Sequence, residues 1–238
     1  MSLLLAFLFA LSQLYQPTTF HFTRLQYRSN YDDTALKNWY TDWPTMDKNV
    51  ITLINRMTNI KAATMRVTPN ATALHMFPFL YVVEPEQMIL SHAEASNLRT
   101  WFKRGGFMWM DDFHGDLEFE TALATLRKIL PDAQPIELEV AHPLFHIFFD
   151  INRIERVVTN SIVICKPDGC EQWENGPSGK EPKVFAVFDD NGEIQVLMTF
   201  NSDTGDALEF ADDPTYPREM SSYGIRLCVN IIIWSLSH

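Results

Sequence analysis

Two apolar runs, FLYVV at 79–83 and FMWM at 107–110, constrain the fold of this chain more than any other feature. Neither is interrupted by a polar residue, which is typical of a strand that is covered on both faces. Between them, Ser91 and Glu94 form the capping box of a helix that ends at Gly105-Gly106. A strand, a helix and a second strand in this order predict two parallel strands joined by a crossover helix.

The same alternation of strand and helix extends over the first 140 residues. Further strands are predicted at 20–27, 64–67 and 136–140, and a further helix at 45–58. Another helix is predicted to follow a cap at Asp116 and to extend to Leu130. After residue 150 the pattern predicts strands at 156–165 and 183–200, with a hairpin turn at 190–192, and a final helix from about 218. We therefore predict one α/β domain over residues 13–238. It has a parallel sheet with helices on both faces and a β-hairpin elaboration in the C-terminal half.

The charge of the chain argues against a nucleic-acid partner. The formal net charge is −11 over 238 residues. The sequence contains no cluster of lysines and arginines of the kind that binds a phosphate backbone.

The segment from Leu3 to Leu11, LLLAFLFAL, is apolar and uncharged. It is too short to span a bilayer but has the length of the apolar core of a signal peptide. Cleavage before Gln13 would follow small residues at the expected positions, so we predict that residues 1–12 are a signal peptide. The mature protein would then be exported, periplasmic or secreted, with no stable transmembrane segment. The alternative is a buried N-terminal strand or helix.

The three cysteines fit an exported chain. Cys165 and Cys170 flank the turn sequence KPDG, so a hairpin there would bring the two sulfurs together, and an oxidising compartment would favour a disulfide. Cys228 lies in an apolar helical pattern and is predicted to be a buried thiol.

Several segments, in this order and spacing, resemble the DUF4159 family, bacterial proteins of unknown function. They are GGFMWMDDF at 105–113, HPLFHIFFDI at 142–151, NSDTGDALE at 201–209 and GIRLCVNIIIWSLSH at 224–238. The resemblance implies a flavodoxin-like domain, similar to class I glutamine amidotransferases and to ThuA-like proteins of sugar metabolism. Such amidotransferases carry a cysteine nucleophile at a strand-to-helix elbow. Here that position reads Met110-Asp111-Asp112, so nucleophilic glutaminase chemistry is not expected.

Polar side chains follow three predicted strands. Ligands bind outside the carboxyl ends of strands in open parallel sheets. We therefore expect one ligand-binding site at this edge, formed by Asp111, Asp112, His114, His142, Asn201, Asp203 and Asp206.

Two functions fit such a site. The first is a non-catalytic module without a cofactor, which binds a small molecule or a carbohydrate or assembles with another envelope protein. The second is a metal-assisted hydrolase that uses Asp111, Asp112, His114 and His142, with Asp111, Asp112 and His142 as ligands of a divalent metal. The structural alternative is that these acids only cap helices and turns.

Overall fold

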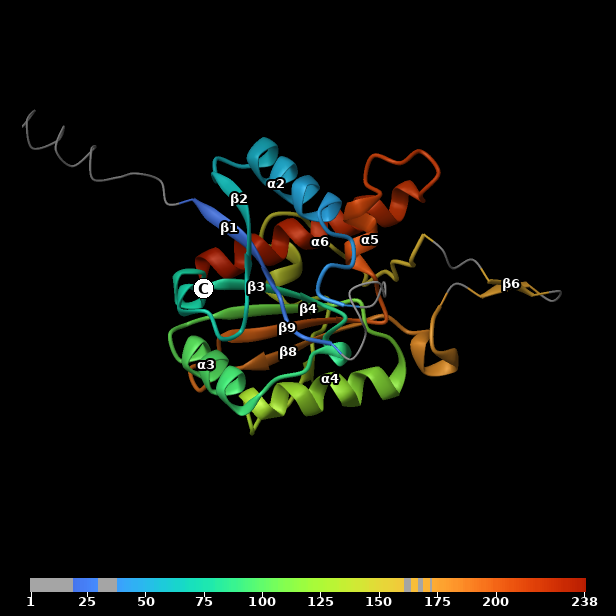
Figure 1. Ribbon diagram of the computed structural model, residues 1–238. Helices are drawn as coiled ribbons and strands as arrows, with labels where there is room; N and C mark the ends of the chain where they lie inside the picture. The colour runs from blue at the N-terminus through green and yellow to red at the C-terminus, as the bar shows by residue number, and fades with distance from the viewer. Residues whose placement is uncertain (1–18, 30–37, 161–163, 167–168, 172) are drawn as a thin grey trace, which may run out of the picture.

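The computed structural model describes residues 19–29, 38–160, 164–166, 169–171 and 173–238. The predicted signal peptide, residues 1–12, lies outside the described residues. A seven-stranded mixed sheet with strand order β2-β1-β3-β4-β9-β8-β5 forms the centre of the molecule (Figure 1). Its strands are β1 (Phe20–Leu25), β2 (Ala62–Val67), β3 (Phe79–Val83), β4 (Phe107–Asp111), β5 (Ile136–Glu137), β8 (Lys183–Phe188) and β9 (Ile194–Phe200).

Five neighbouring strands, β2, β1, β3, β4 and β9, run parallel to one another, whereas β8 is antiparallel to both β9 and β5. From β1 the chain adds β2 on one side and β3, β4 and β9 on the other, so the strand order reverses between β1 and β3. The crevice outside the carboxyl ends at such a reversal is where open α/β sheets bind ligands.

Helices cover both faces of the sheet, which confirms the predicted α/β class (Figure 1). One face carries α2 (Thr45–Met57), α5 (Thr204–Glu209) and α6 (Arg218–Ser237), and the other carries α3 (His92–Phe102) and α4 (Gly115–Ile129). The run FLYVV is apolar throughout because Phe79, Tyr81 and Val83 belong to the first core, whereas Leu80 and Val82 belong to the second. Short 3₁₀ helices lie at η1 (Thr72–Met76), η2 (Pro85–Gln87), η3 (Pro143–His146) and η4 (Gly176–Gly179).

Most of the predicted elements are present. The capping box of α3 forms as expected: the Ser91 hydroxyl accepts from the Glu94 amide and the Glu94 carboxylate accepts from the Ser91 amide. The β8–β9 hairpin is also confirmed, as is the burial of Cys228. Helix α4, however, begins one residue before Asp116, with His114 at its N-cap.

Two strand predictions were correct only in part. Residues 156–160 form no strand, and the other described residues of the predicted segment 156–165, Ile164 and Cys165, belong to β6 (Ile164–Lys166). The strand predicted at 136–140 stops after Glu137, because a turn closed by the His142 amide on the Glu139 carbonyl redirects the chain. None of the helices in the described part of the chain combines the length and apolarity that crossing a membrane requires.

β6 pairs antiparallel with β7 (Gly169–Glu171), with Cys165 and Cys170 as directly opposite backbone partners. This backbone register is compatible with the disulfide that the sequence predicts, which stays a prediction. We expect both cysteines to resist alkylation of the unfolded protein until a reductant is added, as measured by mass spectrometry. Alkylation of both thiols without reductant, in protein folded under oxidising conditions, would contradict the disulfide.

Candidate functional site

Three of the parallel strands end in a sharp backbone turn. Glu84 after β3, Asp112 after β4 and Asn201 after β9 have φ angles of 48°, 59° and 57°, in the left-handed region that non-glycine residues rarely adopt. Such conformations cost roughly 1–3 kcal/mol each, and they persist where the surrounding structure fixes them. The polar residues that follow these strands are thereby held at one edge of the sheet.

Asp111 turns into the core instead of facing solvent. Its carboxylate accepts hydrogen bonds from the Tyr81 hydroxyl at 3.0 Å, the Gly205 amide at 3.0 Å and the Thr199 hydroxyl. Burial, together with the neighbouring charge of Asp112, raises the pKa of Asp111 to about 7. Asp111 therefore joins β4 to β3, β9 and α5, and it is a positioning residue.

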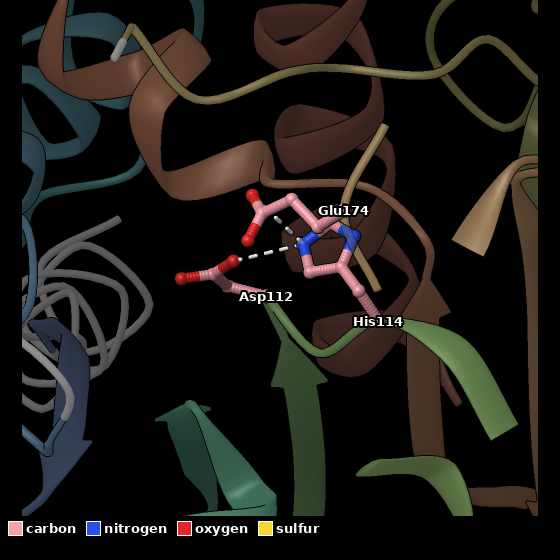
Figure 2. Close-up of side chains that lie close together, drawn as sticks. All are labelled: Asp112, His114 and Glu174. Carbon is pink, nitrogen blue, oxygen red and sulfur yellow. Dashed lines mark hydrogen bonds and ion pairs between the residues drawn. The ribbon is translucent and has the colours of Figure 1, made fainter. Parts of the chain in front are cut away.

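Asp112, His114 and Glu174 converge beyond the end of β4 (Figure 2). His114 Nε2 lies 3.1 Å from Asp112 Oδ1 and 3.8 Å from Glu174 Oε1. Potential ligand atoms of the three residues all lie within 4.8 Å of one another. Burial alone would lower the pKa of His114, but the hydrogen bond and the charge of Asp112, with the charge of Glu174, raise it overall.

Asn175, the residue after Glu174, fastens this segment to His114. The Asn175 side-chain amide donates to the His114 carbonyl at 2.8 Å. The side chain of Asn201 also contacts this region. Its Oδ1 accepts from the Gly115 amide at 2.9 Å, and its Nδ2 donates to the Ser178 and Glu181 carbonyls. The side chain of Asn201 is thus occupied with fastening α4 and the 174–181 segment to the end of β9.

Asp42, Asp203 and Asp206 form a second group, again with potential ligand atoms within 4.8 Å of one another. Asp203 caps α5, since its Oδ1 accepts from the Asp206 amide at 2.8 Å, and Asp206 accepts from the Asn160 amide at 2.5 Å. Burial is the main cause that raises the pKa of all three carboxyls, and the negative charge of Asp112 adds to it. The Asp112 charge therefore acts on the whole second group.

Asp112 and Glu174 of the first group, and all three residues of the second group, border one pocket of about 620 Å³. Its walls contain seven carboxylates but, among the described residues, no lysine, arginine or histidine: Asp42, Glu84, Asp112, Glu174, Asp203, Asp206 and Glu209. Three aromatic residues, Tyr40, Trp43 and Phe210, also line the wall. The pocket is therefore rich in carboxyl groups, with apolar rings beside them.

The prediction that His142 lies at this edge was wrong. Its ring packs against Trp234 with centroids 5.2 Å apart, and its Nδ1 accepts from the Leu144 amide. Trp234 borders a different pocket together with Phe107, the first residue of β4, so His142 lies toward the opposite end of that strand from Asp111. The turn after Glu139 carries the histidine onto α6.

The structure adds four acids that the sequence analysis did not select: Asp42, Glu84, Glu174 and Glu209. Glu84 directly follows the run FLYVV, so the rule that identified Asp112 applies to it equally. Asp42 follows β1 at a distance, in a loop tied down by Arg24. Glu174 follows the β6–β7 hairpin, and no pattern in the sequence marks it.

The raised pKa values predict how stability changes with pH. Asp111 and Glu86, another buried carboxyl near this edge, have pKa values of about 7, well above the usual value for an unfolded chain. The folded state therefore binds protons that the unfolded state releases, so this stabilisation is complete at low pH and is lost as pH rises through about 7. With a chelator present, we expect the free energy of unfolding to rise by about 1–3 kcal/mol from pH 8 to pH 6, measured by urea titration.

Glu86→Gln provides the comparison for this pH effect. It removes one of the two groups with a pKa of about 7, so the difference in stability between the two pH values should shrink. Stability that falls on going from pH 8 to pH 6 would show that these carboxyls are ionised in the folded state.

Comparison with known proteins connects this geometry to a family. Residues 21–236 match the family described as Domain of unknown function (DUF4159). The chain belongs to this family. The match spans the central sheet from the second residue of β1 and includes both groups of carboxyl and imidazole side chains described above. No curated protein matches the chain.

Proposed function

We propose that this DUF4159 protein binds a divalent cation through Asp112, His114 and Glu174, and that the cation helps to hold a polar ligand such as a carbohydrate in the adjoining pocket. The observation that carries the proposal is the meeting of one imidazole and two carboxylates within 4.8 Å, beside a pocket lined by seven carboxylates. Neighbouring carboxylates repel one another, and a bound cation would reduce this repulsion.

The donor set indicates which cations fit. One nitrogen and two carboxylate oxygens suit zinc, manganese or iron(II), whereas oxygens alone suit magnesium or calcium. In the absence of a cation, His114 has a raised pKa and is held between two carboxylates as a proton donor. A cation at this point would displace that proton, so binding should weaken as pH falls.

The pocket supports a ligand beyond the cation itself. Its volume of about 620 Å³ falls in the range of small-molecule sites. Carboxylates accept hydrogen bonds from hydroxyl groups, and the rings of Tyr40, Trp43 and Phe210 offer apolar surface to the C–H face of a sugar. A carbohydrate offers both the hydroxyl groups and the apolar C–H face that such a pocket can bind.

The test of cation binding is a titration of chelator-treated protein with Mn²⁺, Zn²⁺, Mg²⁺ and Ca²⁺ by calorimetry, alongside elemental analysis of protein purified without chelator. We expect saturable binding of Mn²⁺ or Zn²⁺ at neutral pH. His114→Gln should weaken Zn²⁺ binding more than Mg²⁺ binding, since it removes the nitrogen ligand. The absence of saturable binding for all four cations would end the proposal.

Metal-assisted hydrolysis is the second candidate function, and the state of Asp203 favours it. Its side chain borders the pocket, is 4% exposed and has a pKa raised well above the usual range by burial and by the charge of Asp112. A buried carboxyl with a raised pKa could protonate a leaving group, and a cation held by Asp112, His114 and Glu174 would supply an activated water as the nucleophile. Release of reducing ends from an oligosaccharide, lost in Asp203→Asn with cation affinity retained, would identify an enzyme; unaltered oligosaccharide would leave the binding function.

We also propose a flavodoxin-like fold related to class I glutamine amidotransferases, and export of the mature chain. The order β2-β1-β3-β4-β9 supports the first, since it is the 2-1-3-4-5 order of flavodoxin-like sheets. The apolar segment at 3–11 supports the second. N-terminal sequencing of the secreted or periplasmic protein should begin at Gln13.

A further inference from the structure

A second hollow adjoins the acidic pocket at Trp43. It has a volume of about 440 Å³ and lies between α2, the end of β1 and the edge strand β2. Trp43 borders both hollows, and its side chain is 38% exposed, an unusual position for so large an aromatic residue. A ligand that extends out of the acidic pocket would therefore contact the indole of Trp43.

The charge of the second hollow has the opposite sign. Lys48 and Arg66 are exposed and border it. Among the described residues, the one acid in its wall is Asp47, which is 1% exposed and accepts hydrogen bonds from Arg24, the shortest at 2.6 and 3.1 Å. Because Arg24 already neutralises Asp47, the accessible charge that the described residues bring to this hollow is positive.

The exposed side chain of Arg66 places its guanidinium over two aromatic rings. Its guanidinium carbon lies 4.5 Å from the ring centroid of Trp43 and 5.6 Å from that of Trp39. Such cation–π contacts fix the orientation of the guanidinium, which lowers the entropy lost when it binds an anion. The indole of Trp43 and the guanidinium of Arg66 that lies over it therefore both border this hollow.

We infer that the two hollows form one extended site for an acidic oligosaccharide, with one sugar at the acidic pocket and the next ring against Trp43, its anionic group at Lys48 and Arg66. The inference rests on the proposed binding of a carbohydrate with a cation, and it specifies the ligand class. A guanidinium recognises a carboxylate, phosphate or sulfate through paired hydrogen bonds. A single-stranded nucleic acid would also offer rings and anions, so the test includes an oligonucleotide to distinguish it from an acidic oligosaccharide.

The test uses short oligomers of galacturonic, glucuronic and mannuronic acid, each beside its methyl ester, and a short oligonucleotide, with Mn²⁺ present. We expect at least one acid to bind about tenfold or more tightly than its ester. Arg66→Gln and Lys48→Gln should each reduce this preference several-fold and leave Mn²⁺ binding unchanged. Lys61→Gln, an equal loss of charge at an exposed lysine outside both hollows, should preserve it.

Three results would overturn the inference: equal affinity for, or no binding of, the acids and esters; a preference that persists in both Arg66→Gln and Lys48→Gln; or tighter binding of the oligonucleotide than of every oligosaccharide. If Mn²⁺ binds and the oligosaccharides fail in these ways, only the ligand class is wrong. If Mn²⁺ also fails to bind, the proposed cation site falls with it.

Discussion

Replacing Arg24 with methionine should destabilise the protein by about 3–5 kcal/mol, because it leaves the carboxylate of Asp47 buried without its partner. Arg24 is fully buried, and its guanidinium donates to Asp47 at 2.6 Å. It also donates to the backbone carbonyls of Trp39 at 3.1 Å and Thr41 at 2.7 Å, so it holds the loop that carries Asp42. Urea unfolding of the variant at neutral pH would give the loss directly.

The double variant Arg24→Met with Asp47→Leu separates the charge from the packing. Removing both members of a buried pair is often far less costly than removing one. We expect the double variant to recover much of the lost stability. A loss under about 1 kcal/mol in Arg24→Met alone would show that the pair is not buried in solution.

Asp112→Asn should reduce cation affinity by about 100-fold or more. Mutating residues that only support metal ligands costs about 10–100-fold in affinity, and a direct ligand should cost at least as much. Asparagine has nearly the same shape as aspartate and tolerates the left-handed backbone at this position, where φ is 59°. The variant should therefore fold, and calorimetric titration with Mn²⁺ would measure the loss.

Asp116→Asn is the matched control. Asp116 is exposed in the first turn of α4, four positions further along, and its substitution changes the net charge of the protein by the same amount. We expect cation affinity to change by less than about twofold, since an exposed charge is largely screened. Equal losses in the two variants would mean that the cation responds only to the overall negative field.

The central sheet and most of its helices could be predicted from local pattern. The runs FLYVV and FMWM are apolar throughout because helices cover both faces, and the capping box of Ser91 and Glu94 marks the start of α3. The predictions failed where distant contacts decide the path of the chain. Nothing near Glu137 shows that the strand ends there and turns onto α6.

Part of the candidate site could also be predicted from local pattern, namely from the acids that follow the strands. Asp112 directly follows β4, Asp203 and Asp206 come within six residues of the end of β9, and the structure brings all three to one pocket. Asp111 faces the core because it shares the strand face of Trp109, and alternation along β4 could have indicated this. Glu174 could not be predicted, since its place depends on Asn175 and Asn201, which fasten its segment to His114 and β9.

The most direct test of the cation site is an anomalous difference map from a crystal of the protein grown or soaked in MnCl₂. We expect a peak about 2.0–2.3 Å from oxygens of Asp112 and Glu174 and from His114 Nε2. The peak should disappear in crystals of Asp112→Asn. A map with no peak among these three side chains, at Mn²⁺ concentrations that saturate the protein in solution, would contradict the assignment.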